Sequence, residues 1–335
     1  MRDDNLGGLY KPLTSEQIEK IHNAALTILE DIGITYTPDQ VDLIEELTNA
    51  GVQIDHERSR ILFDHKIVRK ALAHAPGRIV LYSRNGQNDL DLHGDRVHFG
   101  TGGTTTEILD VDTGRCRPCC LEDVYQIARL VERLDNIDLF IRPCTPMELP
   151  PEQYDVNICY AGLKGTRKHV MMGIFDERRV VDVIDIAAMV AGGIEKLRAQ
   201  PILSFYTSFG LSPLQQTYRP TRILYEAVSN QIPISVSSAP LAGMTGPISL
   251  AGTLTLAHAE VMSGIVMAQL INPGAPVIYG GLPVVGDMQT ANFASGAMEA
   301  GIMNAAIHQV AKHIHIPNAT SCGFSDSKLP DSQAS

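Results

Sequence analysis

The chain alternates short strand-like runs with longer helical stretches from residue 96 onward, and this rhythm constrains the fold more than any other feature. The runs rich in apolar and β-branched residues are 97–102, 137–143, 169–175, 202–209, 234–239, 276–281 and 318–322. The helical stretches between them are 121–134, 152–163, 177–198, 217–230, 248–271 and 295–313. Strands that alternate with helices of this length form βαβ units, so the pattern predicts a parallel sheet.

Two architectures arrange such units, a doubly wound sheet and a TIM (β/α)8 barrel. No Gly-x-Gly-x-x-Gly opens a helix after the first run, because Gly100, Gly102 and Gly103 have the wrong spacing for a dinucleotide-binding turn. The unit length of roughly 30 to 40 residues fits the barrel. Too few residues follow the last run for a further helix, strand and helix. We therefore expect a C-terminally incomplete barrel of about seven strands at 96–335, taken from a longer gene product.

The segment before the barrel predicts a separate small domain. Residues 14–33 and 38–49 have helical periodicity, and 52–63 alternates apolar and polar residues about a turn. A helix near 66–74 then leads to a strand at 78–82. We expect an N-terminal α+β cap at 1–95, and a hairpin at 108–116 that decorates the first unit of the barrel.

Charge and composition exclude several classes of partner. The chain has 27 Lys and Arg against 38 Asp and Glu, a net charge of −11, and such a field repels nucleic acid. Hydrophobic residues make up 44% of the 335 residues and aromatics only 5%, so the core is mostly aliphatic. The low-charge surface is compatible with a homo-oligomer.

The sequence also predicts a cytoplasmic location. The start of the chain has no basic segment followed by an apolar stretch, so we expect no signal peptide. The most apolar stretch, 261–271, is shorter than the roughly 20 residues that cross a bilayer, so we expect no membrane contact. The six cysteines are expected to be reduced.

In a barrel of this kind the active site lies at the carboxyl ends of the strands. The residues at these ends are Thr101, Gly102, Gly103, Cys144, Phe175, Tyr206, Ser208, Phe209, Ser237, Ser238, Tyr279, Gly280, Gly281 and Phe324. Several are aromatic in a chain with few aromatics, and Asp287 follows the sixth run. Aromatic faces beside a carboxylate suit an organic cation. Phe175 and Phe209 could equally fill the barrel interior.

Two further features carry weaker signals. The loop 240–247 leads into a helix, whose free backbone N–H groups could hold a carboxylate, although an ordinary βα loop fits as well. His258, inside that helix, is interpreted as a core histidine. Cys116, Cys119 and Cys120 lack a second cysteine pair and a nearby histidine at ligand spacing, so we predict no bound metal.

Longer motifs lie mostly in the second half of the chain. They are LAGTLTLAHAEVMSGIV at 250–266, PVIYGG at 276–281, DMQT at 287–290, and SDSK at 325–328 followed by Asp331 and Gln333. Shorter ones are TGR at 113–115, RP at 117–118 and NID at 136–138. Together they resemble the trimethylamine methyltransferase family over almost the whole chain.

The resemblance implies a TIM-barrel enzyme that moves a methyl group from a methylated amine to the Co(I) corrinoid (cobalamin) of a separate small protein. The partner then carries the cofactor, and this chain supplies positioning and desolvation rather than a nucleophile. The resemblance supports Tyr279, Phe324 and Asp287 as substrate-binding residues. Barrel geometry adds Tyr206, Phe175 and Gly102. A substrate carboxylate could sit against 243–246 or 101–103.

One position separates the branches of the family. The resemblance implies that members acting on trimethylamine carry pyrrolysine two residues before the Asp of the SDSK stretch, and here that position is Phe324. A phenyl ring cannot activate a neutral amine, but it can stack on a cation. The sequence therefore favours a small-molecule quaternary amine of the glycine betaine type as the substrate.

Three other interpretations remain open from the sequence. The chain could be a trimethylamine:corrinoid methyltransferase, or a truncated fragment that binds a quaternary amine without turning it over. An unrelated barrel lyase or aldolase ranks last, because the strand ends lack a lysine and a cluster of metal-binding carboxylates.

Overall fold

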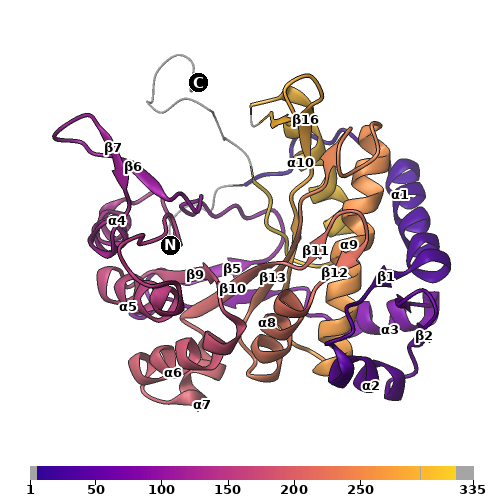
Figure 1. The fold of residues 1–335 in the computed structure, drawn as a ribbon, viewed down its shortest axis with the longest axis horizontal. Coiled ribbons are helices and arrows are strands. Elements are labelled where there is room, and N and C mark those ends of the chain that lie inside the picture. Colours follow the sequence, from indigo (N-terminus) through magenta and orange to yellow (C-terminus); the bar gives the residue numbers. More distant parts are fainter. Residues whose placement is uncertain (1–5, 295, 322–335) are drawn as a thin grey trace. The chain divides into compact units, whose positions relative to one another are not determined.

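The computed structural model describes residues 6–294 and 296–321, and its main sheet has five parallel strands (Figure 1). These are β8 (Leu139–Ile141), β9 (His169–Gly173), β10 (Leu203–Ser208), β13 (Ile234–Ser238) and β15 (Val277–Gly281). They lie in the order β15-β13-β10-β9-β8, so strands that follow each other in the alternating pattern are neighbours. The predicted α/β fold with a parallel sheet is confirmed.

The first and last predicted runs lie at the edges of this sheet as single bridges. Gly100 pairs in parallel with Leu139 of β8, and Asn318 pairs in parallel with Tyr279 of β15. Each of the seven runs thus contributes to the parallel arrangement, five as strands and two as bridges. Within residues 6–294 and 296–321 no pairing closes the sheet into a barrel.

The strands form at short runs that are rich in apolar residues. Every residue of β9, β13 and β15 is buried, as expected for a parallel sheet covered on both faces. Because both faces are buried, a period-two pattern such as the alternating serines of β13 does not mark a solvent face.

The chain divides into two compact units. Unit 1 comprises mainly Arg78–Tyr206 with Asn230–Ile234, and unit 2 comprises mainly Gly8–Gly77, Thr207–Ser229 and the chain from Ser235 on. This division follows a different line from the predicted cap at 1–95 and barrel at 96–335, which therefore stay predictions.

Unit 1 contains four α-helices among its described residues, all labelled in Figure 1. They are α4 (Leu121–Arg133), α5 (Tyr154–Gly165), α6 (Val180–Ala191) and α7 (Ile194–Ala199). The single helix predicted at 177–198 is wrong, because Gly192 (φ 89°) and Gly193 (φ 127°) end α6 and start α7. Short hairpins join β4 (Ile79–Leu81) to β5 (Leu90–Leu92) and β6 (Glu107–Leu109) to β7 (Cys116–Pro118), the latter near the predicted 108–116.

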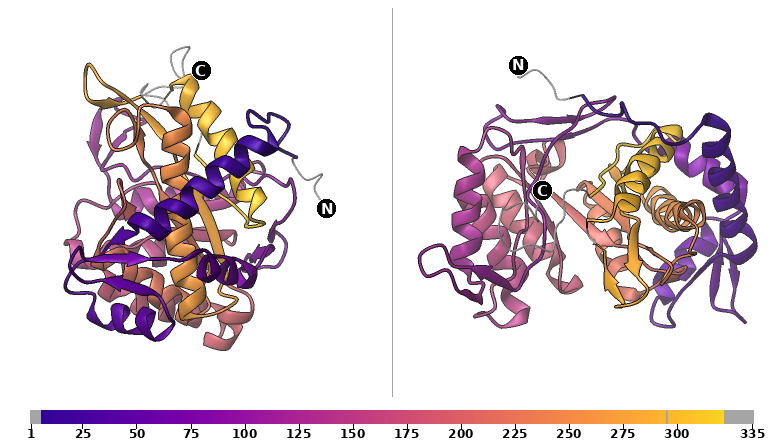
Figure 2. Two further views of the ribbon diagram at one scale, coloured as in Figure 1. Left: turned by 90° about the vertical axis from the view of Figure 1, so that its right-hand side faces the viewer. Right: turned by 90° about the horizontal axis from the view of Figure 1, so that it is seen from above.

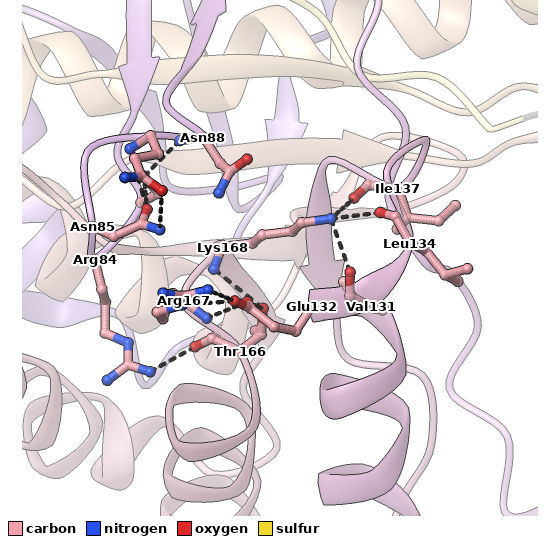
Figure 3. A network of polar contacts seen from close by, with 12 residues as sticks. Arg84, Asn85, Asn88, Val131, Glu132, Leu134, Ile137, Thr166, Arg167 and Lys168 are labelled. Carbon is pink, nitrogen blue, oxygen red and sulfur yellow. Dashed lines mark hydrogen bonds and ion pairs between the residues drawn. The ribbon is translucent and has the colours of Figure 1, made fainter.

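A buried lysine closes the carboxyl end of α4 (Figure 3). Lys168, directly before β9, donates from Nζ to the carbonyl oxygens of Val131 (2.8 Å), Leu134 (2.6 Å) and Ile137 (2.5 Å). The last carbonyls of a helix lack intrahelical donors, and a cation suits the negative end of the helix dipole. Lys168 therefore fixes α4 against the first residues of β9.

Unit 2 is built around one long helix, α9 (Leu250–Ile271). Helices α1 (Ser15–Thr27) and α10 (Met298–His313) both contact α9 (Figure 2, left). The others are α2 (Val41–Asn49), α3 (His65–His74) and α8 (Tyr218–Ser229). At 22 residues α9 exceeds the predicted 261–271 stretch and is long and apolar enough to cross a membrane, which corrects the length argument. In this structure 83% of its most apolar window is buried, as in a core helix.

Small sheets complete unit 2. One has the order β11-β12-β1-β3-β2, from Gly210–Leu211, Gln215–Gln216, Ile34–Thr35, Arg60–Leu62 and Gln53–Asp55. Its β2 and β3 are antiparallel and confirm the turn predicted within 52–63. The other joins β14 (Leu241–Ala242), β16 (Val284–Asp287) and β17 (Asn292–Phe293), which the sequence analysis did not predict.

Candidate functional site

The strand ends of unit 1 bring two predicted site residues around a buried cation. Phe175 follows β9 and Tyr206 lies in β10, while Arg142 directly follows β8. The carboxyl ends of neighbouring parallel strands meet at one edge of a sheet. The guanidinium carbon of Arg142 lies 4.2 Å from the ring centroid of Phe175 and 5.7 Å from that of Tyr206. Sequence reasoning missed Arg142, although a charged residue ending an apolar strand was a visible signal.

Arg142 has few hydrogen bonds for a buried guanidinium. Its side chain is 5% exposed, and Nη1 donates to the carbonyl oxygen of Gly173 at 2.9 Å. Nη2 donates to Oγ1 of Thr104 at 3.4 Å, and the buried Nε has no partner among the described residues. Arg142 also forms no ion pair with any described residue. A buried charge without a partner is unfavourable, so the surroundings suit an added anion.

Asp155 of α5 holds Phe175 in place. Its Oδ1 accepts from the Phe175 N–H at 2.9 Å, and its Oδ2 accepts from the Asp176 N–H at 2.9 Å. Burial raises the pKa of Asp155 above its usual value, and the two N–H groups and the charge of Arg142 partly oppose this rise. The Tyr154 ring packs edge-on against Phe175 with centroids 5.4 Å apart. The half-buried Phe175 ring is therefore fixed beside Arg142.

The Tyr206 ring depends on a missing side chain at Gly173. A Cβ atom at Gly173 would lie 2.7 Å from Cε2 of Tyr206, which is closer than real Cβ contacts. The Tyr206 hydroxyl lies 3.4 Å from Oγ1 of Thr104, so both groups border the same space. Gly102, two residues before Thr104, is exposed, and a Cβ atom added to it would have no other atom within 4 Å. Gly102 thus lies beside open space at the strand end.

The structure places Tyr279 in a different environment, inside unit 2. Its side chain is fully buried, and its hydroxyl lies 3.1 Å from Nδ1 of His258 on α9. Nε2 of His258 lies 3.0 Å from Nδ1 of His22 on α1. Burial lowers the pKa of His258 well below its usual value and lowers that of His22 to about 4, with a further contribution from His313. The prediction that His258 is a core histidine is confirmed. The Tyr279 ring is buried in the same core, so it does not belong to the group of aromatic rings beside Arg142.

Asp287 lies at the exposed end of β16. Its Oδ1 accepts from the Gln289 N–H at 2.8 Å and its Oδ2 from the Thr290 hydroxyl at 2.8 Å. The Gln289 N–H is the main reason that the pKa of Asp287 is lowered. The carboxylate is charged and holds the turn between β16 and β17, and its predicted role as a charge partner stays a prediction.

A buried carboxyl group that the sequence analysis missed lies on α9. Glu260 accepts hydrogen bonds from the hydroxyls of Ser212 (2.7 Å) and Ser238, and from the Leu214 N–H (2.8 Å). Burial raises the pKa of Glu260. An acid inside an otherwise apolar helix was the signal for it. Each described partner is a neutral donor, so the cluster ties Ser238 and the 212–214 segment to α9.

The loop 240–247 is closed on itself. The N–H groups of Gly243, Met244 and Gly246 donate to the carbonyls of Pro247, Leu241 and Leu241 respectively. These groups are not free to hold an anion, so the ordinary βα loop is the better interpretation. Phe209 is 1% exposed and packs against Gly264, which confirms the interior alternative for that residue.

The remaining predicted positions add no further cluster. Cys144 is buried near Cys119, and burial raises the pKa of the Cys144 thiol to about 12. The described residues include no group of three His, Cys, Asp or Glu side chains placed to hold a metal ion. Phe324 lies outside the described residues, so its place in the site stays a prediction.

Comparison with known proteins decides the family. A family model described as trimethylamine methyltransferase (MTTB) matches residues 5–335. The chain belongs to this family. The match covers nearly the whole chain and confirms the resemblance drawn from the motifs.

Curated relatives in the family carry two substrate names. Trimethylamine methyltransferase MttB from Desulfitobacterium hafniense (strain DSM 10664 / DCB-2) is 33% identical over 322 residues, covering 96% of this chain and 64% of the relative. Glycine betaine methyltransferase from Desulfitobacterium hafniense (strain Y51) is 32% identical over 326 residues, covering 97% of this chain and 67% of the relative. Trimethylamine methyltransferase MttB from Methanosarcina thermophila is 31% identical over 327 residues, covering 96% and 67%. The chain spans about two thirds of the length of these relatives.

Proposed function

We propose that this protein transfers a methyl group from a quaternary amine of the glycine betaine type to the Co(I) corrinoid of a partner protein. Membership of the trimethylamine methyltransferase family supports methyl transfer, and one relative is named glycine betaine methyltransferase. The observation that carries the choice of substrate is Phe324, which stands where the resemblance implies pyrrolysine in trimethylamine-specific members.

The leaving group explains why this position matters. Neutral trimethylamine would have to expel a dimethylamide anion, a very poor leaving group. In a quaternary amine the C–N bond breaks with its electron pair remaining on nitrogen, which gives a neutral tertiary amine. The chain then needs no acid to protonate the leaving group.

The chain's own residues position the amine and exclude water. The Phe175 and Tyr206 rings both lie beside Arg142 at the strand ends, and Gly102 has open space beside it. This opening fits the approach of a cofactor carried by another protein. When its carrier docks, the corrinoid supplies the Co(I) nucleophile that accepts the methyl group. The resemblance gives Phe324 and Asp287 as the proposed contacts of the cation.

We further propose that the parallel sheet is part of a (β/α)8 barrel with an N-terminal cap. The chain-order arrangement of strands and the two edge bridges support this architecture. We also propose that the protein works in the cytoplasm, and the burial of α9 as a core helix is compatible with this.

The test is a panel assay with the protein expressed from its own gene and a reduced corrinoid protein. Glycine betaine and other betaines should lower the Co(I) absorbance, while trimethylamine should leave it unchanged. Loss of Co(I) with trimethylamine and with no quaternary amine would overturn the substrate assignment. Phe324→Ala should weaken substrate use while the far-ultraviolet circular dichroism stays the same, and unchanged kinetics would remove Phe324 from the site.

A further inference from the structure

Arg142 changes what the aromatic residues of unit 1 can bind. The faces of Phe175 and Tyr206 point to a bound cation, yet the Arg142 guanidinium already lies over both rings. A second cation on the same faces would meet a like charge. The cluster therefore fits a group of negative charge next to the rings, with any ligand cation held elsewhere in the site.

The guanidinium has donors available for such a group. Arginine carries five N–H donors, and Arg142 uses two nitrogens, both on neutral acceptors. Its Nε has no partner among the described residues although the atom is buried. Asp155, on which the charge of Arg142 acts, is engaged by the Phe175 and Asp176 N–H groups and forms no ion pair with Arg142 among the described residues. The charge of Arg142 is thus left for a ligand.

The neighbouring groups fix the orientation of the Arg142 guanidinium. The Gly173 carbonyl fixes Nη1, and the Phe175 ring, itself held through Asp155, covers the guanidinium plane. The Thr104 hydroxyl lies within 3.4 Å of both Nη2 and the Tyr206 hydroxyl. A planar carboxylate is the anion that a guanidinium binds best through paired N–H groups.

We propose that Arg142 binds the carboxylate of a zwitterionic substrate and so selects betaines over simple quaternary amines. This inference rests on the proposed function and deepens it by naming the residue that recognises the substrate class. Arg142 is the specificity residue for the acid end, and the methylated nitrogen then lies toward the open side marked by Gly102. The ring faces shield the ion pair from water, which strengthens it.

The experiment measures binding by titration calorimetry without the corrinoid partner. Three probes separate the two ends of the substrate: glycine betaine, 3,3-dimethylbutanoate, which keeps the carboxylate but not the cation, and tetramethylammonium, which keeps only the cation. Arg142→Met removes the charge at similar size, and Arg142→Lys keeps the charge but not the paired donors. Arg58→Met, at a side chain that is 77% exposed, is the matched control.

Arg142→Met should weaken glycine betaine and 3,3-dimethylbutanoate by about 100-fold or more, the effect of losing one partner of a desolvated charge pair. Tetramethylammonium should bind as well or better, because a like charge is gone. Arg142→Lys should give an intermediate loss for the two carboxylates, and Arg58→Met no change. Far-ultraviolet circular dichroism verifies that each variant is folded.

Two results would overturn the inference. One is binding of both carboxylates by Arg142→Met within about twofold of the unaltered protein, far below the loss expected for a buried charge pair. The other is a loss of tetramethylammonium binding as large as the loss of carboxylate binding in a folded Arg142→Met variant, which would make Arg142 merely structural. Failure of the proposed function looks different: the unaltered protein would demethylate trimethylamine and no betaine, while 3,3-dimethylbutanoate still depended on Arg142.

Discussion

The hydroxyl oxygen of Tyr279 lies 3.1 Å from Nδ1 of His258, and both side chains are fully buried in unit 2. The neutral imidazole of His258 has one donor and one acceptor nitrogen, and its Nε2 faces His22 at 3.0 Å. The three side chains therefore form a continuous hydrogen-bonded row from β15 through α9 to α1. Each member leaves a buried partner unsatisfied if it is removed.

Tyr279→Phe tests this row. The variant keeps the ring and removes the hydroxyl, so Nδ1 of His258 loses its buried partner. We expect the free energy of unfolding to fall by about 1 to 3 kcal/mol, measured by urea denaturation. Tyr10→Phe, at a side chain that is 60% exposed, is the control and should cause no change. An equal stability of both variants would mean that the hydroxyl does not support the fold.

The free energy of unfolding should decrease as the pH is lowered, because of His169 in unit 1. This fully buried imidazole lies between the Tyr82 carbonyl (3.0 Å) and the Ser204 hydroxyl (2.8 Å), and burial lowers its pKa from 6.5 to about 4. The unfolded chain binds a proton at higher pH than the folded chain. The contribution is therefore complete above pH 6.5 and is lost as the pH falls to about 4.

Urea unfolding measured across this pH interval should show a loss of about 3 kcal/mol from this residue at most. His22, whose pKa is also lowered to about 4, adds to the same slope. His169→Gln should be less stable near neutral pH and should show a shallower pH dependence. His56→Gln, at an exposed histidine, should keep the original slope. An unchanged slope in His169→Gln would contradict the assignment.

Gly173→Ala should disturb the candidate site. The added methyl group would lie 2.7 Å from the Tyr206 ring, so the ring must move from its position beside Arg142. Overpacking of this kind costs about 1 to 3 kcal/mol of stability and should also weaken glycine betaine binding. Gly301→Ala in α10 meets no atom within 4 Å and should leave stability the same or raise it slightly. Thermal melting and calorimetry measure both effects, and a fully stable Gly173→Ala variant with normal binding would refute the close contact.

Lys168→Met should loosen the end of α4. The methionine keeps the apolar stem but removes the ammonium group from the carbonyls of Val131, Leu134 and Ile137 (Figure 3). The loss of that donor from one buried and two part-buried hydrogen bonds should lower the free energy of unfolding by about 1 to 3 kcal/mol. Lys164→Met, at an exposed lysine of α5, is the control. Hydrogen exchange should rise first in the last turn of α4, and protection equal to that of the control would show that the ammonium is dispensable there.

The sequence predicted the parallel sheet well because its signal is local. Each strand lies in a short run rich in apolar residues, and a helix follows each strand before the next strand of the sheet. The helix break at Gly192 and Gly193 was missed, because both flanks keep the same helical periodicity and only the positive φ angles separate them.

The candidate site was harder to predict for a physical reason. Tyr279 lies in a strand in which every residue is buried, so the pattern places it near a strand end without saying which face its ring occupies. The ring turns toward His258 of α9. Arg142 was missed because the aromatic and acidic residues at the strand ends indicated a bound cation. A buried arginine indicates a bound anion instead.

The most direct test of the account follows the methyl carbon itself. The protein is incubated with reduced corrinoid protein and glycine betaine labelled with carbon-13 in its methyl groups, and the products are measured by nuclear magnetic resonance. We predict that dimethylglycine appears in a one-to-one ratio to the Co(I) consumed, while labelled trimethylamine in a parallel sample stays intact. Conversion of trimethylamine to dimethylamine with glycine betaine left unchanged would contradict the account.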